Sequence, residues 1–157
     1  MGPLMTIVQT HTSTHSLPAR SGYIIDGRIA WWKVHARRQA IVLTASGEID
    51  ASNADSFGKT VFRLTAEGDP LVVDLRAVDF CGVQGLQVLV ALDEECRESG
   101  LAWALVAGPA VHALLRIGDF GASLPVVPSV ADALQRFESD KRAGRQLLSL
   151  NLSERNA

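Results

Sequence analysis

The chain has 157 residues, and 47% of them are hydrophobic, which is enough to fill the core of one domain. Its formal net charge of -2 provides no overall basic field of the kind that holds nucleic acid. The 2 cysteines do not indicate a disulfide framework, so we expect a reducing, cytoplasmic location. The 4 histidines show no metal-ligand spacing, and we predict neither a metal nor another cofactor.

The two ends of the chain differ in composition from its middle. Residues 1–27 are rich in Thr, Ser, His and Pro, and we predict a flexible leader without a signal peptide, because the apolar run at 5–8 is too short. Residues 28–139 form the predicted domain. Residues 140–157 form a predicted tail, basic at first and then rich in leucine, which either frays or docks as a short amphipathic turn. No apolar run is long enough to span a membrane.

The first predicted elements are two strands, residues 29–35 and 40–49, which are joined by a hairpin turn. The adjacent Trp31 and Trp32 must face opposite sides of the first strand. One of them is expected in the core, and the other is a candidate contact for a partner or for a second copy of the chain in a homodimer. The basic stretch at 33–38 is interpreted as the end of an edge strand, with a phosphate-binding patch as the alternative.

A helix is expected next, because apolar residues recur on one face at helical spacing. The residues of this face are Ala54, Phe57, Val61 and Leu64. Asp50 or Ser52 is expected to cap the start of the helix, Ser52 together with Asp55 as a capping box. Residues 68–70, a Gly-Asp-Pro sequence, are expected to end it.

The middle of the predicted domain continues the alternation of strands and helices. The apolar run at 71–75 is typical of a strand buried on both faces. A loop is predicted at 76–83 and a helix at 84–99. Gly100 is placed to end that helix.

The predicted domain closes with two more strands and two more helices. A buried strand is expected at 101–107, followed by a helix that starts at Pro109, where the missing N–H costs nothing. A short strand is expected at 124–127, and Ser129 caps the last helix. The order is β-β-α-β-α-β-α-β-α, which predicts an α/β fold with a mixed sheet, largely parallel after its opening hairpin.

Four short segments stand at the ends of these predicted elements. They are Gly47-Glu48-Ile49-Asp50, Val73-Asp74-Leu75, Phe80-Cys81-Gly82-Val83-Gln84-Gly85-Leu86 and Pro109-Ala110-Val111. Together with the element order, they resemble the STAS domain, the fold of bacterial anti-sigma factor antagonists. The resemblance covers about residues 28–138 and implies the same fold for them.

The third segment departs from the family's pattern. In bacterial anti-sigma factor antagonists, the second serine of an Asp-Ser-Ser-Gly sequence is phosphorylated by a partner kinase, which is itself the anti-sigma factor. The resemblance places Gln84 at that serine, Val83 at the first serine and Gly82 at the aspartate. A phosphate at this helix start would add close to two negative charges to the partner surface. Gln84 has no hydroxyl, so the usual switch cannot operate at this position.

The resemblance implies a regulatory binding module rather than an enzyme, one that binds a kinase-like anti-sigma factor and so releases a sigma factor. The expected partner-binding residues are Asp50, Cys81, Gly82, Val83, Gln84 and Gly85. Asp50 contacts the partner, caps a helix, or does both. The alternative is an accessory domain that binds a transporter subunit, a nucleotide or a lipid. No catalytic triad, Gly-rich phosphate loop or metal-ligand set is readable in the sequence.

Cys81 has two interpretations, a redox sensor in the loop predicted at 76–83 or a small core residue. A disulfide with Cys96 is not expected. If residues 84–99 are helical, Cys96 lies about 18 Å from the helix start, at ~1.5 Å per residue. A disulfide needs Cα atoms within about 7 Å of each other.

Overall fold

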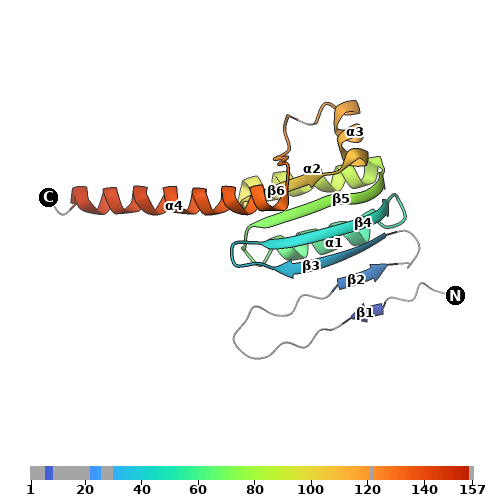
Figure 1. Cartoon of the computed structure of the whole chain (residues 1–157), viewed down its shortest axis with the longest axis horizontal. Helices are drawn as coiled ribbons and strands as arrows, with labels where there is room; N and C mark the ends of the chain where they lie inside the picture. The colour runs from blue at the N-terminus through green and yellow to red at the C-terminus, as the bar shows by residue number, and fades with distance from the viewer. Residues whose placement is uncertain (1–5, 9–21, 26–29, 121, 156–157) are drawn as a thin grey trace.

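A computed structural model describes residues 6–8, 22–25, 30–120 and 122–155 (Figure 1). Its 6 strands form one sheet in sequence order. The strands are β1 (Thr6–Val8), β2 (Gly22–Ile25), β3 (Ala30–Ala36), β4 (Ile41–Ile49), β5 (Leu71–Cys81) and β6 (Trp103–Ala107). Neighbours from β1 to β4 pair antiparallel, and β4, β5 and β6 pair parallel. The predicted α/β fold with a mixed sheet is therefore confirmed.

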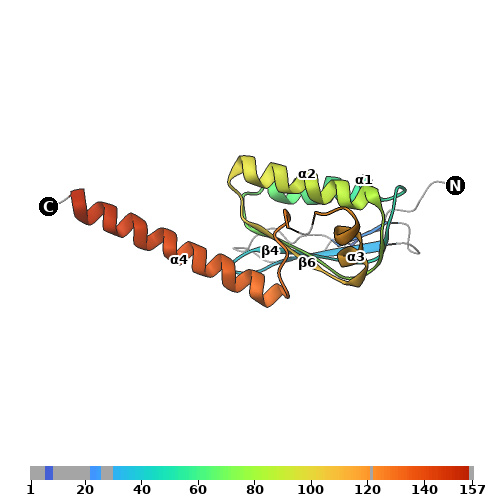
Figure 2. The same cartoon turned by 90° about the horizontal axis from the view of Figure 1, so that it is seen from above.

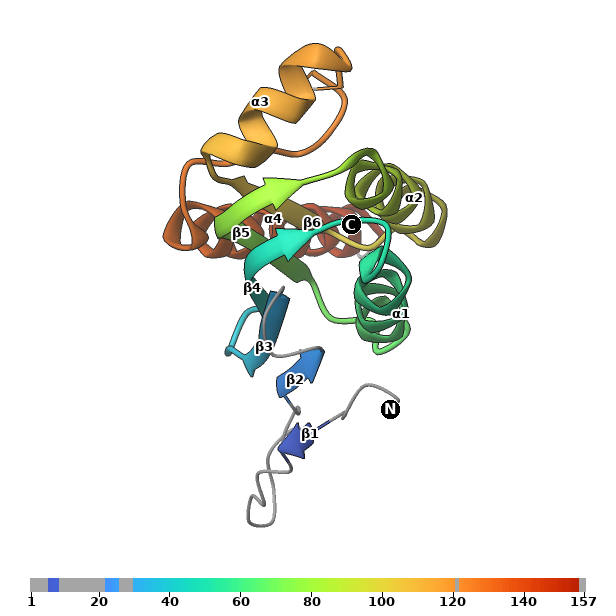
Figure 3. The ribbon, with the colours of Figure 1, turned by 90° about the vertical axis from the view of Figure 1, so that its right-hand side faces the viewer.

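Helices cover both faces of this sheet. They are α1 (Ala54–Thr65), α2 (Val83–Ser99), α3 (Pro109–Ile117) and α4 (Val130–Arg155). Helices α1 and α2 lie side by side on one face, and α4 starts on the opposite face (Figures 2 and 3). Helix α3 packs against β5. The parallel strands thus have the two-sided cover that their continuous apolar sequences predict.

The larger core lies between the sheet and helices α1 and α2. Alternation along β3 sends Trp32 and Val34 into this core and leaves Trp31 and Lys33 exposed, as expected for a strand with one buried face. The rings of Trp32 and Phe57 of α1 meet edge to face, with their centroids 5.7 Å apart. The prediction that one of the two adjacent tryptophans is buried is confirmed.

A smaller core lies under the start of α4. Ala133 and Phe137 of this helix are buried against apolar side chains of the sheet. Those side chains are Val42, Val72, Ala104 and Val106. The predicted cap of the helix is confirmed, because the Ser129 hydroxyl accepts the Asp132 N–H at 3.1 Å.

The predicted leader is wrong where the structure describes it. Residues 6–8 and 22–25 form β1 and β2, which extend the sheet beyond β3. The rest of the predicted leader lies outside the described residues. The sequence of this segment lacks a long alternating pattern, so its strands depend on pairing with one another and with β3.

The loop predicted at 76–83 is also wrong, because β5 continues to Cys81. The apolar run stops at Leu75, since residues 76, 77, 79 and 80 are exposed. Pairing with β4 nevertheless continues to Ile49, across two register shifts. Backbone hydrogen bonding to a neighbouring strand, rather than side-chain burial, defines this half of β5.

The strand predicted at 124–127 is reduced to one parallel bridge between Leu105 and Val126. Pro125 and Pro128 flank that bridge, and neither has an N–H to donate to a ladder.

The last helix continues far beyond the predicted domain boundary at 139, to Arg155. Residues 140–155 are helical and exposed, so the predicted fraying is wrong for them. Lysine, arginine, glutamine and leucine dominate this segment and favour helix. Arg142 and Glu138 add an ion pair one turn apart at 3.6 Å.

Candidate partner-binding site

The predicted site residues converge where β4 and β5 end and α2 begins. Ile49 and Cys81 are paired in the sheet, and the Gly82 N–H donates a hydrogen bond to the Ile49 carbonyl at 2.8 Å. Asp50 follows β4 directly, so it lies beside the start of α2. Figure 3 looks onto these carboxyl ends. We call Asp50 together with residues 81–85 the switch site.

The first turn of α2 presents a neutral, uncapped helix N-terminus. Gly82 is the N-cap residue, in an extended conformation with φ -81 and ψ 175, and it makes no side-chain cap hydrogen bond. Val83 is 58% exposed, and Gln84 is exposed beside it. The first N–H groups of a helix have no partner within it and carry the positive end of the helix dipole. The turn contains no acidic residue, so no side chain of the turn itself compensates this positive end.

Cys81 and Gly85 lie beneath this surface rather than on it. A Cβ added at Gly85 would lie 2.7 Å from Cys81 Sγ and 3.0 Å from Ile49 Cγ2, so only glycine allows α2 to approach β4 and β5 this closely. Burial raises the pKa of the Cys81 thiol to about 11. A thiol with a raised pKa carries little thiolate at neutral pH, which does not favour a redox role.

Cys96, the other cysteine, is also buried, and both thiols are free. Burial, and to a smaller extent Asp93, raises the pKa of Cys96 to about 11 as well. The packing of the two cysteines agrees with their interpretation as small core residues.

Asp50 organises the turn between β4 and α1 but does not cap α1. Its Oδ1 accepts the Ser52 hydroxyl at 2.5 Å and the Ser52 N–H at 2.8 Å. These hydrogen bonds lower the pKa of Asp50, that from the Ser52 hydroxyl most. The cap predicted at Asp50 or Ser52, with Asp55, is wrong, because Asn53 is the N-cap residue and makes no side-chain cap hydrogen bond.

Asn53 is a residue that the sequence did not single out. It is buried, its Oδ1 accepts the Asp50 N–H at 3.0 Å, and its Nδ2 donates to the Glu48 carbonyl at 2.8 Å. Asn53 therefore ties the end of β4 to the start of α1 and leaves the Asp50 carboxylate half-exposed at the switch site.

A groove between α1 and α2 leads away from the switch site. Its volume is about 840 Å³, and Gln84 and Gln87 of α2 face Asp55 and Lys59 of α1 across it. Asp55 and Lys59 form an exposed ion pair at 3.8 Å. The switch site thus adjoins a concave surface with polar edges rather than a closed cavity.

Exposed apolar side chains frame the switch site, and the sequence did not identify them as site residues. Phe80 is 51% exposed and Ile117, at the end of α3, is 85% exposed. A Cβ at Gly118 would lie 3.6 Å from Leu86 Cδ2, which places the end of α3 beside the first turns of α2. Large exposed apolar residues next to a polar groove are typical of a protein-binding surface.

The described residues contain no group of three or more His, Cys, Asp and Glu side chains that could hold a metal ion. Nor does any helix in the described part of the chain combine the length and the apolar character needed to cross a membrane.

Comparison with known proteins agrees with this architecture. The family model of the STAS domain matches residues 32–133, and the chain belongs to this family. Osmosensory protein A of Mycobacterium tuberculosis is 33% identical over 98% of this chain and 100% of its own length. The anti-sigma-F factor antagonist RsfA of the same organism is 35% identical over 60% of this chain and 77% of its own.

A solved structure extends the likeness to three dimensions. The crystal structure of an anti-sigma factor antagonist from Mycobacterium paratuberculosis superposes with a TM-score of 0.62 and 29% identity. The match covers 69% of this chain and 94% of that one. The chain is therefore an anti-sigma factor antagonist-like STAS domain.

Proposed function

We propose that this chain binds a kinase-like anti-sigma factor through the switch site and thereby releases a sigma factor, without being switched by phosphorylation at residue 84. The observation that carries the proposal is the exposed, neutral Gln84 on the first turn of α2. It stands where the family's antagonists have the serine that their partner kinase modifies.

The geometry around Gln84 supports contact with a protein. Val83, Phe80 and Ile117 supply exposed apolar surface, and the groove between α1 and α2 supplies concavity. The residues expected to contact the anti-sigma factor directly are the exposed Val83 and Gln84 and the half-exposed Gly82 and Asp50. The buried Cys81 and Gly85 set the position of the helix.

Because Gln84 is neutral and cannot be phosphorylated, the charge of the binding surface at this position cannot be switched. A phosphoserine carries between one and two negative charges at neutral pH, and such a charge in a partner surface opposes a complex by repulsion and desolvation. Gln84 keeps the binding surface permanently in the uncharged state. Control must then act on the amount of the protein, on another site or on the partner.

Substitution of Gln84 tests the proposal. The partner is first captured from the native cell with the full chain and identified, and its affinity is then measured with purified proteins. Gln84→Glu is expected to weaken the complex about tenfold or more, equivalent to about 1.4 kcal/mol. A carboxylate in the first turn favours the helix, so reduced folding cannot explain the loss.

Gln135→Glu on α4 is the matched control, because it makes the same charge change at an exposed position on the other side of the sheet. Its affinity should stay within about twofold of the original. Equal affinities for the original chain and Gln84→Glu would show that the partner uses another surface. Capture of no anti-sigma factor would refute the proposed partner itself.

The absence of the switch is tested with Gln84→Ser and ATP. The captured kinase is expected to phosphorylate the serine variant at residue 84 and then to release it. The original chain is expected to remain bound under the same conditions. Release of the original chain by ATP would contradict the proposal.

A further inference from the structure

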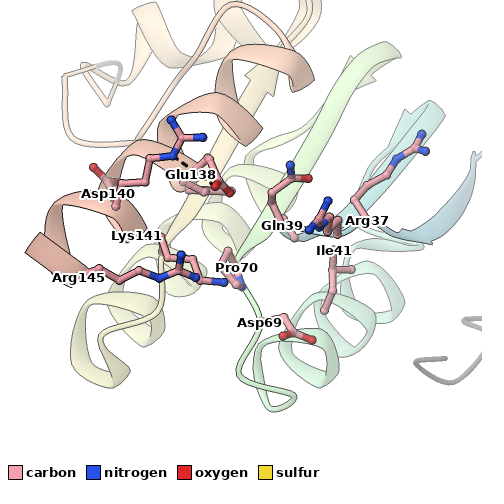
Figure 4. Close-up of a pocket in the computed structure, with 14 residues that line it drawn as sticks. Arg37, Gln39, Ile41, Asp69, Pro70, Glu138, Asp140, Lys141 and Arg145 are labelled. Atoms are coloured by element: carbon pink, nitrogen blue, oxygen red, sulfur yellow. Dashed lines mark ion pairs between the residues drawn. The ribbon is translucent and has the colours of Figure 1, made fainter. Parts of the chain in front are cut away.

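A crevice opens at the opposite end of the sheet from the switch site, at the amino ends of β4, β5 and β6 (Figure 4). Its volume is about 810 Å³, within the range of about 300–1,000 Å³ for small-molecule sites. Ile41, Pro70 and Phe137 contribute apolar lining, and the hairpin between β3 and β4 faces α4 across it. It shares no lining residue with the switch site.

Cationic side chains dominate the rim of this crevice. Arg37 and Arg38 come from the hairpin and three further cations from α4, and together they outnumber the lining carboxylates by two. The cations of α4 are Lys141, Arg142 and Arg145, and the carboxylates are Asp69, Glu138 and Asp140. Glu138 is paired with Arg142, so it is already neutralised. Within the described part of the chain, the remaining four cations form no ion pair.

Two cationic side chains of α4 extend into the crevice. Lys141 and Arg145 extend from the helix toward Pro70, at the start of β5, whereas Asp140 points away from it (Figure 4). Two unpaired cations brought together over a concave, partly apolar surface are electrostatically costly without an anion. The forked guanidinium and the ammonium suit phosphate oxygens.

We propose that this crevice binds a small anion that carries a chain of phosphate groups. Lys141 and Arg145 hold the phosphates, and Arg38 approaches them from the hairpin. The site requires that α4 continue beyond residue 140, because the helix carries three of the five cations across from the hairpin. The inference is independent of the proposed partner, because it involves other residues at the other end of the sheet.

Calorimetric titration of the full chain with inorganic tripolyphosphate tests the proposal. We expect binding with one site per chain, weakened as salt is added. The double variant K141Q/R145Q should lose about tenfold or more in affinity, since it removes two charge-assisted contacts. The control K59Q/R116Q removes the same charge from exposed positions outside the crevice and should change affinity by less than about twofold.

Absence of binding at millimolar tripolyphosphate would overturn the proposal. Equal weakening by both double variants would also overturn it, because it would indicate attraction to net charge alone. A nucleoside triphosphate that competes with tripolyphosphate for the same residues would support the site and identify a nucleotide as the source of the phosphate chain. Tripolyphosphate binding that is insensitive to K141Q/R145Q would refute the small-anion site, because the anion would then lie elsewhere on the chain.

Discussion

Gly85→Ala tests whether the close contact beneath the switch site holds α2 in position. The new Cβ would lie 2.7 Å from Cys81 Sγ and 3.0 Å from Ile49 Cγ2. Both neighbours are buried, so neither can move away freely. Overpacking of this kind costs about 1–3 kcal/mol.

A second effect opposes this cost. Alanine is favoured over glycine inside a helix by up to about 1 kcal/mol. Gly85 lies in the first turn of α2, where that gain is only partly realised. The net expectation for Gly85→Ala is a loss of about 1–2 kcal/mol in the free energy of unfolding.

Urea denaturation of four proteins separates the two effects: the original chain, Gly85→Ala, Cys81→Ala and the double variant. Removing the sulfur of Cys81 opens space for the new methyl group. The double variant should therefore lose about 1 kcal/mol less unfolding free energy than the two single variants lose together. A Gly85→Ala variant as stable as the original chain would refute the packing argument. Additive effects in the double variant would show that Cys81 is not the group that opposes the new Cβ.

Three further predictions concern other parts of the structure. Phe137→Ala should cost about 3–5 kcal/mol of unfolding free energy because it empties the core under α4, whereas Leu150→Ala on the exposed end of the helix should cost less than about 0.5 kcal/mol. In a Cys96→Ala background, Cys81 should react with a thiol reagent at about pH 8 roughly a hundredfold more slowly than in the unfolded chain, because its pKa is raised from 9.0 to about 11; equal rates would contradict its burial. Asp50 has a pKa below its ordinary 3.8 in the folded chain, so its charge stabilises the fold above pH 3.8 and loses this effect as the pH falls below that value. Asp50→Asn should therefore be less stable than the original at about pH 7, and the difference in unfolding free energy should shrink steadily as the pH is lowered below 3.8; a difference that does not change with pH would contradict the role of the charge.

Much of the fold follows from local sequence patterns. Apolar and aromatic residues at 29–35 and alternation at 40–49 predicted two strands joined by a hairpin, which are β3 and β4, and helical spacing predicted α1 and α2. Gly100 ends α2 in the left-handed conformation expected of it, with φ 69. These features depend on residues close together in the chain, so the sequence alone suffices for them.

The errors fall where distant segments decide the structure. The second half of β5 has no apolar run of its own and is a strand because β4 continues beside it. The strand predicted at 124–127 has suitable apolar residues, but its two flanking prolines leave one bridge. Asn53 gave no signal, since its role requires the β4–α1 turn to exist before its amide can bind both Glu48 and Asp50.

The switch site, too, combines features that the local sequence predicts with features that depend on distant segments. The resemblance identified the segment around Gln84, but burial separates it into an exposed surface and the supporting Cys81 and Gly85. Phe80 belongs to the segment that carries the resemblance, yet its exposure depends on the pleat of β5, and the sequence predicts a loop at this position. The exposure of Ile117 depends on where α3 ends relative to α2, and no local pattern contains that information.

The proposed anion crevice and the switch site lie at opposite ends of β5. The strand has 11 residues, which at ~3.3 Å per residue separates its ends by roughly 33 Å. Charges on the surface are screened over about 8 Å at physiological ionic strength, so an anion in the crevice cannot act on the switch site through its field. Coupling between the two sites therefore requires a partner that touches both of them or a shift of the packed strands. Without either, K141Q/R145Q and Gln84→Glu should have additive effects on partner affinity, and a departure from additivity would demonstrate such a connection.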